Sequence, residues 1–332
     1  MRYLVTGGAG FIGSHLVEAL LEGEHEVLVL DDFSTGRHEN IAHLEPCDRL
    51  EVICASVTDT DLVRDCVPSV DGVFHLASAV GVRLIIDEPV KTIETNVEGT
   101  ASVLAACARY RKPVLITSTS EVYGKLDKAP FSEEDDSVIG PPTFRRWGYA
   151  ASKALDEFLA LAHWHQSRLP VVIVRLFNTV GPRQTGRYGM VVPRFVRQAL
   201  LGEPITVYGD GEQTRCFCHV RDAVWALVRL FATRESRGEV FNVGSGEEIS
   251  IHALAATIRS MTGSRSEIRR VPYAQAFGSS AFEDMVRRVP DLAKVRRLIG
   301  YQPKHSLEDT LRDVIRSVRR ELETDEKAGV IK

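Results

Sequence analysis

The chain has 332 residues, 44% hydrophobic and 26% charged, with a net charge of -4 at pH 7. This length exceeds the usual size of one domain, so we expect two lobes and an ordinary globular core. The small negative charge, without a long basic run, argues against nucleic acid as a partner, because phosphate backbones require clustered Lys and Arg. We also expect no membrane span and no signal peptide, which predicts a cytoplasmic protein.

Six cysteines are spread along the chain without CxxC spacing or a companion cluster of histidines. This pattern indicates neither a zinc site nor a thioredoxin-type pair, so we expect no metal and reduced, structural thiols. Cys216 and Cys218 alternate in a strand-like run, and we interpret them as packed small residues.

The first half of the chain alternates predicted strands and helices. Residues 3–6 indicate a buried strand, residues 14–22 have apolar residues at helical spacing, and residues 27–30 indicate a second strand. Further strands are predicted at residues 50–54, 72–75, 113–117 and 171–175. This rhythm predicts an α/β fold with a doubly wound parallel sheet, the Rossmann fold, and helices on both faces.

After Arg175 the pattern changes to loops rich in Gly, Pro and aromatic residues. Helices are predicted at residues 193–202, 251–262 and 307–321. We expect a Rossmann domain over residues 1–176 and a smaller lobe, mainly for substrate, over residues 177–332. Residues 217–231 and 239–243 are expected to return to the main sheet.

A glycine-rich turn follows the first predicted strand. Gly7, Gly10 and Gly13 have GxxGxxG spacing, which lets the backbone and a helix N-terminus approach a pyrophosphate. Asp31, followed by Asp32, ends the second strand about 20 residues later, where a carboxylate accepts hydrogen bonds from the adenosine ribose. Because a carboxylate there repels a 2′-phosphate, we predict that the Rossmann domain binds NAD.

Tyr149 and Lys153 are four residues apart on a predicted helix and therefore share a face. A free Tyr has a pKa of about 10, so it is a poor base at neutral pH unless nearby positive charge stabilises the phenolate. We expect Lys153 to supply that charge and to bind the nicotinamide ribose. Thr119 and Glu121 follow a predicted strand, at the carboxyl end of the sheet where such folds bind ligands.

Together these segments resemble the extended short-chain dehydrogenase/reductase family of nucleotide-sugar epimerases, dehydratases and decarboxylases. The resemblance covers essentially the whole chain and rests on TGGAGFIGSHL (6–16), LDD (30–32), HLA (75–77), TNVEGT (95–100), TSTSEVYG (117–124), YAASK (149–153), RLFNTVGPRQ (175–184) and YGDGEQTRCFCHVRD (208–222). It implies that Tyr149 takes the proton of the sugar 4-hydroxyl while hydride leaves C4 for NAD, with Thr119 fixing the oxygen. A 4-keto sugar results.

The resemblance also implies the residues that contact both ligands and an oligomeric state. The expected cofactor contacts are Gly7, Gly10, Phe11, Ile12, Gly13, Asp31, Asp32, Val57, Leu76, Ala77, Asn96, Thr117, Tyr149, Lys153 and Phe177. The expected contacts with a UDP-sugar are Thr119, Ser120, Asn178, Arg187, Val192, Tyr208, Arg215 and Arg288. Arg215 and Arg288 would clamp the diphosphate, since each guanidinium offers forked donors and a fixed charge. Helices near residues 90–109 and 149–165 would pair across a homodimer.

One departure from the family pattern concerns the adenine. The family often has an Asp after the third strand, where this chain has Ser56. The hydroxyl of Ser56 or the carboxylate of Asp59 would have to supply that contact.

A 4-keto sugar can receive hydride on the opposite face, lose a C5 carboxylate as carbon dioxide, or eliminate its 6-hydroxyl. Glu121 resembles the residue that assists chemistry at C5 in decarboxylases and dehydratases. The lack of an MHxxDGR-like run near residues 184–190 and the DDFSTGR segment at 31–37 favour an epimerase instead. Arg187, or else Arg145 or Arg146, would hold a hexuronate carboxylate in the ring plane, and a carboxylate so held resists decarboxylation.

We therefore expect a NAD-dependent UDP-sugar 4-epimerase that interconverts UDP-glucuronate and UDP-galacturonate. The alternatives are a UDP-glucose 4-epimerase, a UDP-glucuronate decarboxylase, a nucleotide-sugar 4,6-dehydratase, and a NAD-binding sensor without activity. The intact set of Thr119, Tyr149 and Lys153 argues against the sensor.

Overall fold

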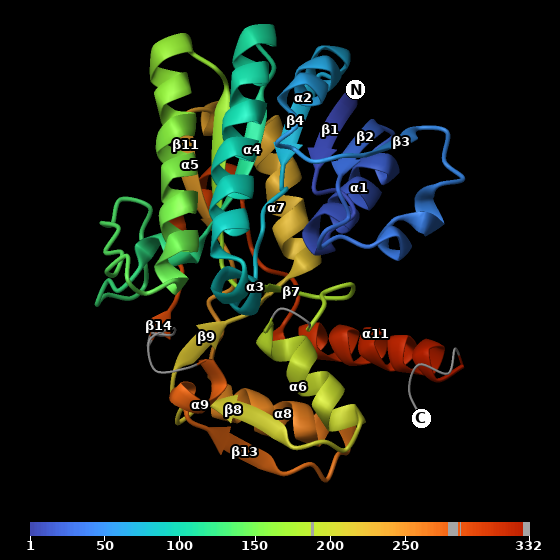
Figure 1. Ribbon diagram of the computed structural model, residues 1–332, viewed down its shortest axis with the longest axis vertical. Coiled ribbons are helices and arrows are strands. Elements are labelled where there is room, and N and C mark those ends of the chain that lie inside the picture. The colour runs from blue at the N-terminus through green and yellow to red at the C-terminus, as the bar shows by residue number, and fades with distance from the viewer. Residues whose placement is uncertain (187–188, 278–284, 286, 328–332) are drawn as a thin grey trace.

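The computed structural model describes residues 1–186, 189–277, 285 and 287–327 (Figure 1). Its central sheet is parallel throughout, with the strand order β11-β6-β5-β4-β1-β2-β3. These strands are β1 (Arg2–Thr6), β2 (Glu26–Asp31), β3 (Leu50–Cys54), β4 (Gly72–His75), β5 (Val114–Thr119), β6 (Val171–Leu176) and β11 (Glu239–Val243). The order reverses at β1, as in a doubly wound Rossmann fold, so the predicted fold class is confirmed.

Helices cover both faces of this sheet (Figure 1). On one face lie α1 (Phe11–Glu22) and α7 (Val220–Ala232), and on the other lie α2 (Thr60–Cys66), α4 (Pro89–Tyr110) and α5 (Arg146–Ser167). Neighbouring residues of a strand point to opposite faces, so Val5 packs under α1 whereas Leu4 packs under α4. Both side chains are fully buried, and the continuous apolar composition of the strands is thereby explained.

The chain leaves the main sheet at the end of β6 and returns to it later. Strand β11 pairs in parallel with β6, from Glu239 opposite Val172 to Val243 opposite Leu176. The segment at 217–231, by contrast, is mostly the helix α7, which packs against α1. Residues 239–243 thus form the edge strand of the main sheet and α7 covers one of its faces, so the chain after residue 176 contributes to both lobes.

The smaller lobe lies beyond the carboxyl ends of the sheet strands (Figure 1). Its apolar core, which includes Phe195, Leu254 and Leu311, is enclosed by α6 (Val191–Leu200), α8 (Ile251–Thr262) and α11 (Leu307–Lys327). Its strands are β8 (Ile205–Tyr208), β9 (Thr214–Cys216), β12 (Glu248–Ser250), β13 (Ile268–Val271) and β14 (Arg287–Arg288). The remaining short elements are α3 (Val82–Asp87), β7 (Thr179–Val180), β10 (Cys218–His219), α9 (Tyr273–Phe277) and α10 (Ala293–Ile299).

The thiols are unpaired, and all six cysteines are free. Burial raises the pKa of Cys216 and of Cys218 to about 12, so both are protonated at neutral pH and act as packed apolar groups. Among the described residues, no cluster of three or more His, Cys, Asp or Glu side chains is placed to hold a metal ion. No helix in the same part of the chain has the length and apolar character needed to cross a bilayer.

Acid should destabilise the fold through His75, at the end of β4. The ring lies between the hydroxyls of Thr6 (2.7 Å) and Thr100 (3.1 Å), and burial, aided by the charge of Lys153, lowers its pKa to about 3. An unfolded His titrates near pH 6.5, so below this pH the unfolded state binds a proton that the folded state does not bind. We expect the free energy of unfolding to fall by about 2 kcal/mol between about pH 6.5 and pH 5 through this residue.

The measurement is chemical denaturation of the wild type and of His75→Gln across that pH range. The other buried histidines are present in both proteins, so their contributions cancel in the difference between the two slopes. Equal slopes would show that His75 is not responsible.

Candidate active site

A cleft at the carboxyl ends of the strands is built around the glycine turn after β1. Gly7 has φ of +71°, and a Cβ there would lie 2.7 Å from the backbone nitrogen of Ala77. A Cβ at Gly13 would lie 2.0 Å from the carbonyl oxygen of Gly7, so both positions require glycine for close backbone packing. Gly10 is the N-cap of α1 and faces the cleft, where N–H groups of the helix N-terminus can receive a phosphate.

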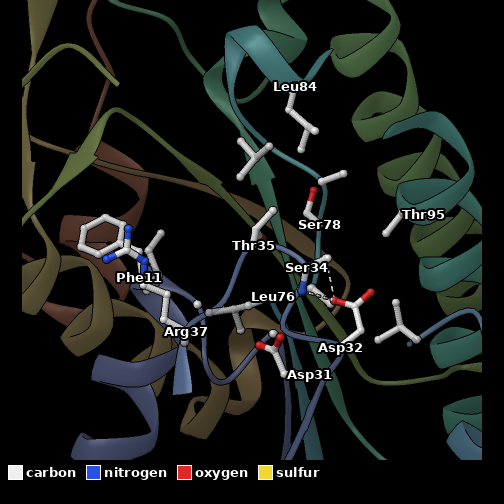
Figure 2. Close-up of a pocket in the computed structure, with 18 of the residues that line it drawn as sticks. Phe11, Asp31, Asp32, Ser34, Thr35, Arg37, Leu76, Ser78, Leu84 and Thr95 are labelled. Carbon is white, nitrogen blue, oxygen red and sulfur yellow. Dashed lines mark hydrogen bonds between the residues drawn. The ribbon is translucent and has the colours of Figure 1, made fainter. Parts of the chain in front are cut away.

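The two acidic residues at the end of β2 have different surroundings. Asp31 is 7% exposed, and its carboxylate accepts hydrogen bonds from the backbone N–H groups of Ala9 (2.9 Å) and Phe33 (2.8 Å). Burial raises the pKa of Asp31, and these two N–H groups oppose that shift. Asp32 is exposed and accepts from the backbone N–H and the hydroxyl of Ser34. Both line the cleft, where Asp31 has the rigid placement expected of a ribose partner (Figure 2).

The cleft includes most, but not all, of the predicted cofactor residues. Those that line it are Gly7, Gly10, Phe11, Ile12, Gly13, Asp31, Asp32, Val57, Leu76, Ala77 and Thr117. Asn96 lies behind the wall, where its side-chain oxygen accepts from Ser78 Oγ (2.9 Å) and from the backbone N–H of Ala79 (2.8 Å). Phe177 is fully buried against Tyr123 and Phe131, so here it packs the core instead of lining the cleft.

Several cleft residues were not predicted. Figure 2 shows that they come from the loop after β2 (Ser34, Thr35, Arg37), from the loop after β4 (Ser78), and from α3 and α4 (Leu84, Thr95). Arg183, Gln184 and Thr185 close the cleft from the loop after β7, where Arg37 Nη2 lies 3.4 Å from Thr185 Oγ1. Most of them lie inside or directly beside the segments that carry the family resemblance, such as 31–37, 95–100 and 175–184, which was the sequence signal for them.

Ser56 and Asp59, the two candidates for the adenine contact, have different surroundings. Ser56 lines the cleft, and its hydroxyl lies 2.9 Å from Thr58 Oγ1. Asp59 is instead the N-cap of α2, where its carboxylate accepts from the backbone N–H of Leu62 (3.1 Å). Asp59 is therefore committed to the helix terminus.

Tyr149 lies at the start of α5 and is 7% exposed. Burial raises its pKa and the negative charge of Glu121 raises it further, whereas hydrogen bonds with Thr119 and Ser78 lower it. Because Ser78 lines the cleft, these bonds place the phenol at the boundary between the cofactor cleft and the Thr119 strand end. The predicted grouping of Tyr149, Thr119 and Glu121 is thus present.

Lys153 lies one helical turn below Tyr149, but its environment differs from the expectation. Its ammonium donates to Asp156 Oδ2 at 2.8 Å, and the two side chains are 3% and 1% exposed. The ammonium therefore does not act on Tyr149 as an uncompensated positive charge, and the pKa of Tyr149 is raised instead of lowered. Contact between Lys153 and the nicotinamide ribose stays a prediction.

Glu121, in the 3-10 turn after β5, is held between two guanidinium groups. Arg146 Nη2 donates to both of its carboxylate oxygens, at 3.2 and 3.0 Å, and Arg288 Nη1 donates to Oε1 at 2.8 Å. The three side chains are 5%, 15% and 12% exposed for Arg146, Glu121 and Arg288. Charge-assisted bonds of this kind fix an ionised carboxylate in one orientation. The sequence predicted Arg146 only as a possible partner for a substrate carboxylate, and not as a partner of Glu121. Arg145, the other candidate for the substrate carboxylate, donates to the backbone oxygen of Ile86 (3.3 Å).

Arg288 was expected to clamp a diphosphate together with Arg215. The two arginines are indeed opposite each other across the parallel strands β14 and β9. However, Arg288 is turned to Glu121, while Arg215 donates to the carbonyl of Thr214 (2.7 Å) and is 5% exposed. The structure therefore brings Arg288 to the sugar-chemistry end of the site.

The other predicted substrate residues lie on several different elements. Asn178, with φ of +32°, donates to Cys216 O (3.0 Å) and so ties the end of β6 to β9. Ser120 and Val192 are each 1% exposed, and Tyr208 ends β8, with the guanidinium of Arg194 4.0 Å from its ring centroid. Arg187 lies outside the described residues, so its predicted role with a carboxylate is not addressed by the structure.

Comparisons with known proteins show the family to which the chain belongs. A family model for GDP-mannose 4,6 dehydratase matches residues 4–314. The chain is 42% identical to the UDP-N-acetyl-alpha-D-glucosaminuronate decarboxylase of Bacillus cytotoxicus, over 98% of this chain and 99% of that protein. It is 40% identical to UDP-glucuronic acid decarboxylase 1 of Xenopus tropicalis, over 97% of this chain and 73% of that protein.

Among solved structures, the chain resembles UDP-glucuronic acid 4-epimerase from Bacillus cereus, which was solved in complex with UDP-glucuronic acid and NAD. The TM-score is 0.87 and the sequence identity is 30%, and the match covers 97% of this chain and 100% of that one. The dTDP-glucose 4,6-dehydratase of Bacillus anthracis has a TM-score of 0.85 and 26% identity, covering 97% and 98%. The chain therefore belongs to the GDP-mannose 4,6-dehydratase family, a group of extended short-chain dehydrogenase/reductase enzymes that act on nucleotide sugars.

Proposed function

We propose that this protein is a UDP-hexuronate decarboxylase, with UDP-glucuronate as the substrate to test first. The observation that carries the proposal is Glu121, an ion-paired carboxylate close enough to Tyr149 to influence its pKa. Relatives named as decarboxylases, at 37% to 42% identity over nearly the whole chain, support it. They favour decarboxylation over the 4-epimerisation expected from the sequence.

The cofactor is NAD, and the chemistry it supplies is the acceptance of hydride from C4 of the sugar and its return. Tyr149 would accept the proton of the 4-hydroxyl, and Thr119 would hold the same oxygen. The resulting ketone is β to the C5 carboxylate, so the electrons of the C5–carboxylate bond can move onto the C4 oxygen as carbon dioxide leaves. A phenol proton returned from Tyr149 would stabilise the oxyanion that forms there.

Glu121 would act on the orientation of the substrate carboxylate. Loss of carbon dioxide requires the C5–carboxylate bond to stand perpendicular to the plane of the C4 carbonyl. An arginine that grips the carboxylate in the ring plane prevents this alignment. Because Glu121 already occupies Arg146 and Arg288, neither guanidinium is available as an unopposed clamp.

Incubation of the purified protein with UDP-glucuronate, without added reductant, tests the proposal. Proton NMR should show UDP-xylose or a UDP-4-keto-pentose, together with release of carbon dioxide. UDP-galacturonate at a stable equilibrium, without loss of carbon, would show a 4-epimerase instead. A parallel reaction with UDP-N-acetylglucosaminuronate tests the substrate of the Bacillus cytotoxicus relative.

We also propose a homodimer built on α4 and α5, which pack side by side at one edge of the molecule (Figure 1). Their outer faces expose Val90 (66%), Ile93 (43%), Leu155 (50%) and Phe158 (72%). Apolar groups gathered on one surface indicate an interface. Phe158→Glu should convert the dimer to a monomer, because it buries a charge in that interface, and sedimentation would show the change in mass.

Leu201→Glu is the matched control, since Leu201 is 40% exposed but lies at the end of α6, in the other lobe. It should leave the mass unchanged. A Phe158→Glu variant that sediments as the wild type does would place the dimer contact elsewhere.

A further inference from the structure

The inner face of α5 carries a buried ion pair that the mechanism above does not use. Lys153 and Asp156 are one turn apart, 2.8 Å separates Nζ from Oδ2, and both side chains are almost fully buried. The other oxygen of Asp156, Oδ1, has no hydrogen-bond partner among the described residues. Burial raises the pKa of Asp156, whereas Lys153 and, to a lesser extent, the hydroxyl of Thr100 on α4 lower it. The pair is thus the main support of the ionised carboxylate.

The charges on neighbouring elements already have partners of their own. On α5 itself, Glu157 binds Arg175 of β6 (2.7 Å) and the hydroxyl of Ser118 on β5. On β4, burial and the charge of Lys153 together lower the pKa of His75 to about 3, so its ring stays neutral.

On α4, Asn96 donates to Ser152 of α5, and Thr100 contacts His75. In the turn after β5, Glu121 is bound by Arg146 and Arg288. Asp156 is therefore the carboxylate that the fold assigns to Lys153.

This pairing changes the field at Tyr149. An isolated ammonium on the same helix face would favour the phenolate, whereas an ammonium 2.8 Å from a carboxylate presents a dipole whose field falls off faster with distance. The charge of Asp156 accordingly acts to raise the pKa of Tyr149, after the larger effects of burial and Glu121.

We propose that Asp156 is a positioning residue that fixes Lys153 beneath the site and cancels much of its effect on Tyr149. Tyr149 then remains protonated until the cationic nicotinamide ring adds a second positive charge. Proton transfer is thereby made conditional on a loaded cofactor site. The inference rests on the proposed function in one respect, namely that Tyr149 is the proton-transfer group.

Asp156→Asn tests this proposal, because it removes the charge but keeps an oxygen that can accept from Lys153. The ionisation of Tyr149 is followed without cofactor or sugar by the ultraviolet absorbance of tyrosinate. Subtraction of the same titration in the Tyr149→Phe background isolates this residue from the other tyrosines. We expect the titration to move to lower pH by about one unit, which is roughly a tenfold increase in the phenolate fraction on its acidic side.

The acidic limb of the pH–rate profile should move in the same direction, so Asp156→Asn should be faster than the wild type at the acid end. Asp156→Glu should restore the original profile. Structural damage would lower the rate at every pH and could not produce the gain.

The matched control is Asp61→Asn on α2, which removes an exposed carboxylate that binds Arg64 at the same i,i+3 spacing. This variant should shift neither the titration of Tyr149 nor the pH–rate profile. Asp156→Ser, a smaller replacement with a hydroxyl oxygen, carries the same expectation if the Asn variant does not fold. An unmoved Tyr149 titration in a folded variant would overturn the proposal. Because the titration needs no substrate, a failed decarboxylation assay leaves this test intact.

Discussion

Tyr149→Phe is expected to reduce turnover of the nucleotide sugar by roughly 10²- to 10⁴-fold, the usual range for loss of a general acid–base group. The phenol is 7% exposed and bonded to Thr119 and Ser78 at the boundary of the cofactor cleft. Removing its oxygen deletes the proton acceptor for the 4-hydroxyl but leaves the glycine turn and Asp31 intact. Cofactor binding, measured by calorimetry, should therefore remain close to that of the wild type.

Tyr110→Phe at the end of α4 is the matched control, since it deletes the same hydroxyl away from the cleft and should leave turnover unchanged. Full activity of Tyr149→Phe would assign the proton transfer to another group. If the wild type binds the cofactor but shows no turnover, and Tyr149→Phe does not change cofactor binding, the result would favour the NAD-binding sensor.

Glu121→Gln should lower the rate of carbon dioxide release by about 10²-fold or more, the lower end of what a positioned ionisable group contributes. The neutral amide no longer holds Arg146 and Arg288 by charge, so a guanidinium becomes free to grip the substrate carboxylate in the ring plane. Oxidation at C4 depends on Tyr149 and should persist. The expected product mixture therefore contains a larger share of UDP-4-keto-hexuronate or UDP-galacturonate, which proton NMR distinguishes from pentose products.

Arg146→Gln should instead leave release of carbon dioxide close to that of the wild type, because it removes one of the two possible clamps while Glu121 still binds Arg288. Glu134→Gln, at an exposed position in the loop after the same turn, makes the same chemical change away from the site and should have no effect. Undiminished release of carbon dioxide by Glu121→Gln would remove Glu121 from the C5 step.

The cofactor half of the site was largely predictable because its parts are close together in the sequence. Gly7, Gly10 and Gly13 fall within one strand-turn-helix unit, and Asp31 ends the next strand, so periodicity and spacing alone indicate where they meet. The family resemblance extended this to the strand ends at Leu76 and Thr117, which also line the cleft. Arg37 and Arg183 were missed because their positions depend on how two loops fold over the cleft.

The chemistry at C5 was not predictable in the same way. Arg288 reaches Glu121 across 167 positions of sequence, through a strand of the smaller lobe, and no local pattern predicts that contact. From the sequence, Arg288 resembled a diphosphate ligand, and Arg146 one of several candidates for a carboxylate. Their convergence on one carboxylate, together with the relatives named as decarboxylases, is what supports the proposed decarboxylation over epimerisation.

The sequence by itself predicted the doubly wound fold and the NAD cleft, because the alternation of strands and helices follows from local patterns. The family resemblance implied that Tyr149 and Thr119 act on the same sugar oxygen. The tertiary structure decided which charges are paired. Residue spacing shows only that Lys153 shares a helix face with Tyr149, so the sequence predicts a cation that acts on Tyr149. In the structure the ammonium is buried and binds Asp156. A buried charge must find a counter-charge, and the identity of that partner is a property of the packed interior.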